Sequence, residues 1–181
     1  MVVSAKDVLS FWFEEITPAQ RWKKDKQFDQ EIRTRFYETY RAAAQCELFH
    51  WREIAKGRLA EVIVLDQFAR NMFRDSSQSF AADPLALVLS QEAIALGLDK
   101  ELNSDERSFL YMPFMHSESL RIHEVAVELF IANGNQGNLD FEYKHKRIIE
   151  RFGRYPHRNK VLGRESTEEE LEFLSQPGSS F

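Results

Sequence analysis

Residues 25–49, DKQFDQEIRTRFYETYRAAAQCELF, decide the fold class. Their apolar side chains recur at spacings of three and four residues, which is the period of one face of an α-helix. This stripe consists of Phe28, Ile32, Phe36, Tyr40 and the pair Ala43 and Ala44. We therefore predict a long helix from near Asp25 to Phe49, with Cys46 inside its apolar pattern as an inert core thiol.

Helical signals continue on both sides of this segment, whereas strand signals are almost absent. Gly57 is expected to interrupt one helix, and Asp83 is expected to cap the next. The expected helices cover about residues 4–17, 25–49, 58–73, 83–97, 105–113, 118–133, 139–152 and 167–174. About eight helices with short connections predict an all-α fold of antiparallel pairs.

The composition is that of one globular protein, with 181 residues, 43% hydrophobic and 29% charged. No Pro-, Gly- or Ser-rich linker divides the chain, so we expect a single all-helical domain over residues 1–175 and a flexible tail over 176–181. The net charge of −5 provides no basic field for nucleic acid, and the longest apolar run is too short to span a membrane. One cysteine cannot form an intrachain disulfide, so we expect a cytoplasmic protein. The oligomeric state stays open.

Polar residues interrupt the apolar pattern in three places, the first at residues 66–74. On a helix, Asp66 and Arg70 lie one turn apart, and Asn71 follows them. Asp66 comes directly after an apolar run, and a charge beside a buried face is usually paired. This first cluster is therefore a partly buried structural network, a ligand site or a solvated face, and the sequence does not choose among them.

The second polar cluster, residues 112–119, lies where one helix ends and another begins. Ser117 is expected to cap the new helix, which places Glu118 in a first turn that favours a carboxylate. His116 stands beside two methionines and a phenylalanine, so it is either a buried structural histidine or a ligand-binding one. His116, Glu118 and His123 do not have a known metal-ligand spacing, so we expect no metal and no cofactor.

The third polar cluster, FGRYPHRN at residues 152–159, follows neither helical nor strand periodicity. It presents Arg154, His157, Arg158 and Asn159 after a helix stop. Arginine forks match the oxygens of carboxylates and phosphates, and a histidine titrates near neutral pH or donates a hydrogen bond. The segment is thus either an anion pocket or a set of arginines that locks the C-terminal segment onto acidic residues.

These segments together resemble a known family. The matching stretches are VLSFWF (8–13), WKKD (22–25), LDQFARN (65–71), PFMHSE (113–118) and FGRYPHRN (152–159). Across nearly the whole chain the sequence is similar to a family of uncharacterised bacterial proteins, a domain of unknown function with a tetratricopeptide-repeat-like all-helical fold. The resemblance implies helix pairs stacked into a right-handed superhelix, and it implies no reaction. The chain departs from the family pattern at Ala69, where Pro is expected, and at His123, where Gln is expected.

Because the resemblance places all three polar clusters in one family pattern, we expect them to meet in one site. The expected function is a binding module for an anionic small molecule or a peptide carboxylate, with a protein partner on a concave face. The arginines of the site clamp the anion, and its carboxylates orient the arginines or take a ligand amine. The expected site consists of Asp66, Arg70, Asn71, His116, Glu118, Arg154, His157, Arg158 and Asn159.

Two other functions fit the same residues. A small-molecule hydrolase would use His116 or His157 as its general acid or base, with the arginines stabilising an anionic transition state. A purely structural network would pair these side chains with one another and leave no cavity between them. Binding of nucleic acid is disfavoured because an acidic block, Glu165–Glu172, follows the basic segment.

Overall fold

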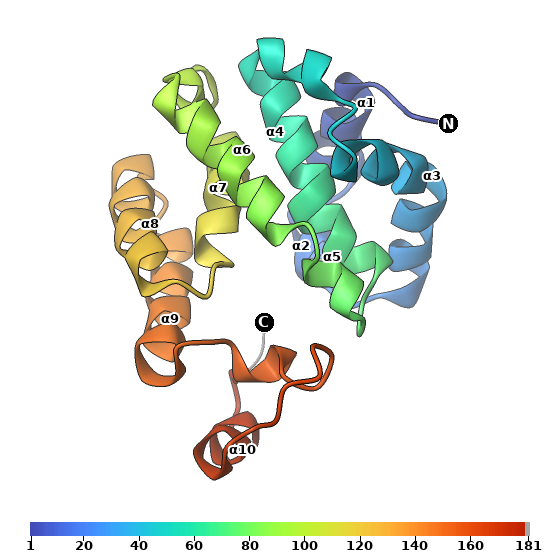
Figure 1. The fold of residues 1–181 in the computed structure, drawn as a ribbon. Coiled ribbons are helices and arrows are strands. Elements are labelled where there is room, and N and C mark those ends of the chain that lie inside the picture. The colour runs from blue at the N-terminus through green and yellow to red at the C-terminus, as the bar shows by residue number, and fades with distance from the viewer. Residues whose placement is uncertain (180–181) are drawn as a thin grey trace.

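A computed structural model describes residues 1–179 of the protein. Throughout this part of the chain the regular structure is helical and contains no strand (Figure 1), which confirms the all-α class. The helices are α1 (Ala5–Ser10), α2 (Pro18–Trp22), α3 (Lys26–Ala44), α4 (Ala55–Ile63), α5 (Ala69–Met72), α6 (Asp83–Ala95), α7 (Ser104–Met115), α8 (Leu120–Asn133), α9 (Gln136–Phe152) and α10 (Glu168–Leu174). The tail predicted over 176–181 lies partly outside the described residues, because 180–181 are not among them.

Two of these helices continue without a break into π-helical segments. A π-helical segment, Phe11–Glu15, continues α1, and another, Val64–Phe68, joins α4 to α5. When α1 is counted with the π-helical segment that follows it, and α4 is counted with α5, residues 1–179 form nine helices, whereas about eight were predicted. The addition is α2, where the sequence predicted only a break. Pro18 occupies its first position, where the missing N–H of proline costs nothing.

Helix α3 confirms the long amphipathic helix but ends earlier than predicted. It begins where the Asp25 carboxylate accepts hydrogen bonds from the backbone N–H groups of Gln27 and Phe28. It ends at Ala44 rather than Phe49, because the backbone turns into the left-handed region at Cys46, with a φ of 60°. Cys46 is therefore exposed, and the prediction of an inert core thiol is wrong.

Gly57 does not interrupt a helix. It lies in the first turn of α4, which begins at Ala55. A Cβ atom at position 57 would overlap the backbone carbonyl of Trp51. The glycine is needed for this close approach of two backbone segments, a tertiary requirement that the local sequence does not display.

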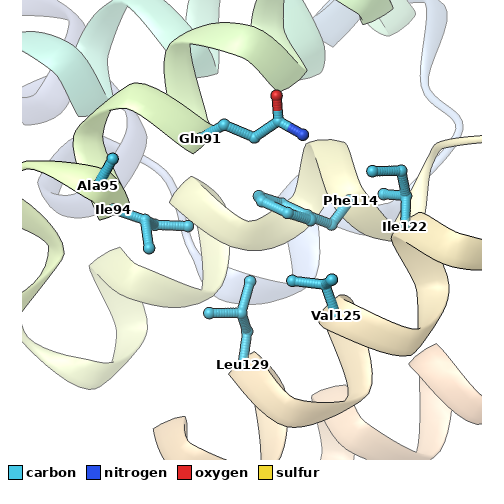
Figure 2. Close-up of a pocket in the computed structure, with 7 residues that line it drawn as sticks. All are labelled: Gln91, Ile94, Ala95, Phe114, Ile122, Val125 and Leu129. Carbon is cyan, nitrogen blue, oxygen red and sulfur yellow. The ribbon is translucent and has the colours of Figure 1, made fainter.

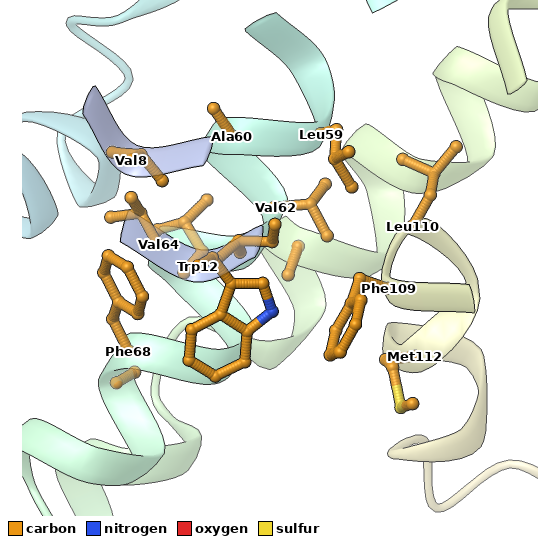
Figure 3. Packing of buried hydrophobic residues seen from close by; sticks show 14 of the residues in the cluster. Val8, Trp12, Leu59, Ala60, Val62, Val64, Phe68, Phe109, Leu110 and Met112 are labelled. Atoms are coloured by element: carbon orange, nitrogen blue, oxygen red, sulfur yellow. The ribbon is translucent and has the colours of Figure 1, made fainter. Parts of the chain in front are cut away.

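Buried aromatic rings join the N-terminal helices to α7 (Figure 3). Trp12 packs edge-on against Phe68 at a ring-centroid distance of 5.6 Å and against Phe109 at 5.5 Å. All three side chains are almost wholly buried. Burying a side chain of this size stabilises the fold by roughly 1.5–3 kcal/mol, so this aromatic centre fixes α7 against the α4–α5 run.

The order of the helices brings the polar clusters to one end of the fold. Helices α6 and α7 lie between the N-terminal helices and the pair α8 and α9 (Figure 1). Short turns join α7 to α8 and α8 to α9, so neighbouring helices run antiparallel. The start of α6, the end of α7 and the end of α9 consequently meet at the same end. No helix among residues 1–179 has the length and the hydropathy needed to cross a bilayer.

Candidate functional site

Asp66 is the buried centre of the polar site. Its carboxylate accepts hydrogen bonds from Nε2 of Gln67 (2.5 Å) and from Nη1 of Arg70 (3.1 Å), and it lies 2.7 Å from Nδ1 of His116. Burial acts against ionisation, but the charge of Arg70 and the hydrogen bond with His116 hold the pKa of this carboxyl well below its usual range. Asp66 is therefore an ionised buried carboxylate held by several partners.

Arg70 joins Asp66 to the start of α6. Its two terminal nitrogens donate to the two oxygens of Asp83, each at 3.0 Å, and Nη1 also donates to the backbone carbonyl of Asp66 at 2.7 Å. Burial works against the charge of Arg70, but the two carboxylates outweigh it and raise its pKa. The prediction that Asp83 caps α6 is wrong: the N-cap residue is Ala82, and both oxygens of Asp83 accept hydrogen bonds from Arg70 instead.

His116 ends α7 and turns its ring toward Asp66. Burial and then the charge of Arg70 lower the pKa of His116, so the ring is neutral near neutral pH. An ionised carboxylate can only accept a hydrogen bond, so Nδ1 of His116 carries the ring proton and Nε2 holds a bare lone pair. No partner for Nε2 exists among residues 1–179. His116 thus offers one unused acceptor.

The guanidinium of Arg158 is held between two aromatic rings. Its Cζ lies 4.5 Å from the ring centroid of Phe80 and 4.5 Å from that of Tyr155. Nη2 donates to the backbone carbonyl of His116 at 3.0 Å, whereas Nη1 reaches Asp83 only at 3.5 Å. Nε is buried without a partner in the described part of the chain. These contacts use only part of the donors that a guanidinium carries, so Arg158 keeps unused N–H groups at a fixed position.

A cleft of about 420 Å³ lies over these side chains. The apolar part of its lining consists of Phe80, Ala81, Pro84, Leu87, Pro113 and Leu162. The polar part consists of Ser77, Asp83, His116, Ser117, Glu118 and Arg158. The cleft therefore brings together three of the nine residues expected in one site, His116, Glu118 and Arg158. Asp66 and Arg70 are not among the lining residues and act on the cleft through His116 and Asp83.

Glu118 anchors the segment that follows α9. Its carboxylate accepts hydrogen bonds from Nη1 (2.7 Å) and Nη2 (2.9 Å) of Arg164 and from the backbone N–H of Tyr155 (2.7 Å). Half-burial acts against ionisation, but these hydrogen bonds lower the pKa of Glu118. The expected N-cap, Ser117, lies two residues before the observed N-cap, Ser119, and its hydroxyl accepts a hydrogen bond from the backbone N–H of Ser119 (3.1 Å). Glu118 therefore precedes α8, and the prediction that it lies in the first turn of that helix is wrong.

Two other predicted residues form a second anchor that does not line the cleft. Nε and Nη2 of Arg154 donate to the two oxygens of Glu170 at 2.7 and 2.8 Å. Asn159 donates to the same carboxylate at 3.2 Å. The hydrogen bonds from Arg154 are the main cause that lowers the pKa of Glu170 to about 2. This anchor ties the segment to α10, the arrangement that the structural alternative predicts for these residues.

Asn71 and His157 also lie outside the cleft lining. Asn71 donates to Asp29 of α3 at 2.8 Å, and Arg74 donates to the same carboxylate at 2.6 and 2.7 Å. The His157 ring lies 5.6 Å from the ring of Tyr155. Burial, followed by the charge of Arg158, lowers the pKa of His157 to about 4.

Sequence reasoning missed a cluster of rings around Tyr155. The ring of this tyrosine lies 6.3 Å from His123, 5.7 Å from His145 and 5.6 Å from His157. Nδ1 of His123 faces the carboxylate of Glu142 at 2.7 Å, with both side chains fully buried. These residues come from α8, α9 and the segment after α9, so no local spacing relates them. Within residues 1–179, no group of three or more His, Cys, Asp or Glu side chains is placed to hold a metal ion.

A second depression, of about 250 Å³, lies between α6, α7 and α8 (Figure 2). It is lined by Gln91, Ile94, Ala95, Phe114, Ile122, Val125 and Leu129. Apart from the amide of Gln91, these side chains are apolar. The groove therefore offers no titratable side chain for acid–base chemistry.

Comparisons with known proteins identify a family and a solved structure that are similar to this chain. A family model described as a bacterial protein of unknown function (DUF924) matches residues 8–178. A solved structure, a protein of unknown function named ATU0120 from Agrobacterium tumefaciens, is 40% identical and covers 94% of this chain and 96% of its own, with a TM-score of 0.89. A comparison with curated proteins found no match.

Proposed function

This chain belongs to DUF924, a family of bacterial proteins of unknown function, and we propose that it is a binding module whose cleft takes an anion, either a small molecule or a peptide carboxylate. The observation that carries this proposal is the state of Arg158. Only 7% of this residue is exposed, and Nε has no partner among residues 1–179. Each terminal nitrogen makes one hydrogen bond, so N–H groups remain at the cleft wall, where a ligand oxygen can pair with this buried cation.

The charges around Arg158 support the same proposal. Burial, and then the charge of Arg70, lower the pKa of Arg158 although Asp83 acts in the opposite direction. The protein's own carboxylates therefore stabilise this cation incompletely. An anion in the cleft supplies the missing interaction, which is strongest where water is excluded.

The three arginines of the expected clamp differ in how well the protein already pairs them. Arg70 donates to Asp66 and Asp83, and Arg154 donates to Glu170. In the proposed site Arg70 holds Asp83 and Asp66 in place, Arg154 anchors the segment, and Arg158 alone contacts the anion.

Titration of acetate and of inorganic phosphate into isotopically labelled protein tests the proposal, with the Nε–H resonance of Arg158 as the readout. We expect this resonance to shift on saturation, because a new acceptor faces the guanidinium. Arg158→Lys should weaken binding, since lysine lacks the planar fork. Arg151→Lys is the matched control, because Arg151 is exposed and pairs with Glu169 at the surface. An unmoved Arg158 resonance at saturating concentrations of both anions would refute the proposal.

A second candidate function, hydrolysis of a small molecule, is supported by the pairing of Asp66 with His116. A carboxylate that orients Nδ1 and leaves Nε2 bare is the arrangement of a general base. His157 is not one of the cleft-lining residues, so this candidate rests on His116. A panel of carboxylic and phosphoric esters tests it: turnover must disappear in His116→Asn and survive in Arg151→Lys.

We also propose that the helix pairs stack as a right-handed, tetratricopeptide-like superhelix with a protein partner on its concave face. The consecutive packing of α7 on α8 and of α8 on α9 supports this arrangement. The single cysteine supports a reducing compartment, the cytoplasm.

A further inference from the structure

The unused groups of the cleft include both a donor and an acceptor. Arg158 offers N–H donors, and His116 offers the lone pair of Nε2. The two residues are held together, because Nη2 of Arg158 donates to the backbone carbonyl of His116 at 3.0 Å. A ligand that satisfies both must carry an acceptor, such as a carboxylate, close to a hydrogen-bond donor.

The two carboxylates of the cleft are already engaged by arginines. Asp83 already accepts two hydrogen bonds from Arg70, and Glu118 accepts two from Arg164 and one from the backbone of Tyr155. Both carboxylates would repel a ligand carboxylate placed against them. The acceptor of the ligand is thereby directed to Arg158, and its donor is directed to His116.

The apolar part of the lining adds a third requirement. Phe80, Leu87 and Leu162 border the cleft and leave apolar surface facing it. A ligand with an apolar branch buries this surface, which stabilises the complex in proportion to the area removed from water. The volume of about 420 Å³ suits one residue-sized group and falls in the range of small-molecule sites.

We propose that the cleft binds an N-acylated apolar amino acid, free or as the last residue of a peptide. Its carboxylate contacts Arg158, its amide N–H donates to Nε2 of His116, and its side chain packs on Phe80, Leu87 and Leu162. This inference rests on the proposed anion-binding function and names the class of ligand.

The test compares closely matched probes by isothermal titration of the full chain. N-acetyl-leucine is expected to bind. N-acetyl-leucinamide lacks the carboxylate, and N-acetyl-N-methyl-leucine lacks the N–H donor. Each is expected to bind at least about tenfold more weakly, because a buried partner in the site is left unpaired. In His116→Phe the difference between N-acetyl-leucine and its N-methyl analogue should vanish, since the acceptor is gone.

The outcomes separate this inference from the function on which it rests. If acetate shifts the Arg158 resonance but N-acetyl-leucine binds no tighter than acetate, the inference fails and the anion site stands. If neither binds, both fail. Equal affinity for N-acetyl-leucine and its N-methyl analogue, measured on the unmodified protein, overturns the role of His116 even if the His116→Phe variant does not fold.

One further probe identifies the source of the ligand. An acetylated tripeptide ending in leucine, Ac-Gly-Gly-Leu, should bind at least about tenfold tighter than N-acetyl-leucine if contacts beyond the last residue exist. That result supports the inference with a peptide terminus as the ligand. Equal affinities support it with a free N-acyl amino acid.

Discussion

Glu170 determines how firmly the segment that carries Arg158 is held to α10. Its carboxylate is only 3% exposed and accepts four hydrogen bonds: two from Arg154, one from Asn159 and one from the backbone of Thr167. In Glu170→Gln an NH2 group replaces one accepting oxygen, so whichever way the amide turns, a donor faces a donor. Hydrogen bonds to charged groups contribute about 1.5–3 kcal/mol each, so we expect the free energy of unfolding to fall by about 2–3 kcal/mol.

For a chain of this length that loss corresponds to a decrease in Tm of roughly 4–12 °C, measured by circular dichroism. The pKa of Glu170 is lowered from 4.5 to about 2, so its contribution is complete above its unfolded value and is lost as the pH falls toward about 2. The difference between wild type and Glu170→Gln should therefore be largest near neutral pH and shrink on acidification.

Glu169→Gln is the matched control for this measurement. The Glu169 carboxylate is 59% exposed and pairs with Arg151, itself 47% exposed, so the change should cost under about 0.5 kcal/mol. Equal stability of the Glu170→Gln variant and the wild type at pH 7 would refute the reasoning that this carboxylate holds the segment. A loss that does not diminish at acid pH would refute its assignment to the ionised form.

Three further changes test other parts of the fold. Gly57→Ala should lower the free energy of unfolding by about 2 kcal/mol or more, because the added Cβ overlaps a backbone carbonyl. Gly137→Ala, on α9, is the control: its Cβ meets only an ordinary contact, so the free energy of unfolding should rise by up to about 1 kcal/mol. A rise in both variants would contradict the close approach at Gly57. Cys46 should react with a thiol reagent in the native state, and reaction only after unfolding would contradict its exposure. Asp29→Ala should cost roughly 3 kcal/mol in urea unfolding, since it leaves the partly buried Arg74 unpaired, and a loss under about 0.5 kcal/mol would show that the pair adds nothing.

Local periodicity was sufficient to predict the helices other than α2. The spacing of Phe28, Ile32 and Phe36 lies within one element, and a capping residue such as Asp25 acts on its own first turn. The departures from prediction have a different origin. Cys46 is exposed because the chain leaves α3 just before it, and Gly57 is required by a backbone segment that approaches from outside its helix.

The candidate site was predictable only as a set of residue types. Arg154 and Arg158 lie four residues apart in one segment, yet a 3-10 turn at Pro156–Arg158 separates their partners. The first meets Glu170, and the second meets Asp83 and the cleft. Such pairing depends on which helix ends come together, and sequence spacing within a single loop does not contain that information.

Anomalous diffraction from crystals soaked in 4-bromobenzoate tests most directly whether Arg158 holds an anion in the cleft. This carboxylate carries an aryl bromine, which does not alkylate thiols or imidazoles and which its anomalous signal locates. We predict a bromine peak inside the cleft, with the carboxylate on the guanidinium of Arg158, and its loss in crystals of Arg158→Lys. A cleft without bromine while the soaked anion occupies sites elsewhere, or a peak that persists unchanged in the variant, would contradict anion binding by Arg158.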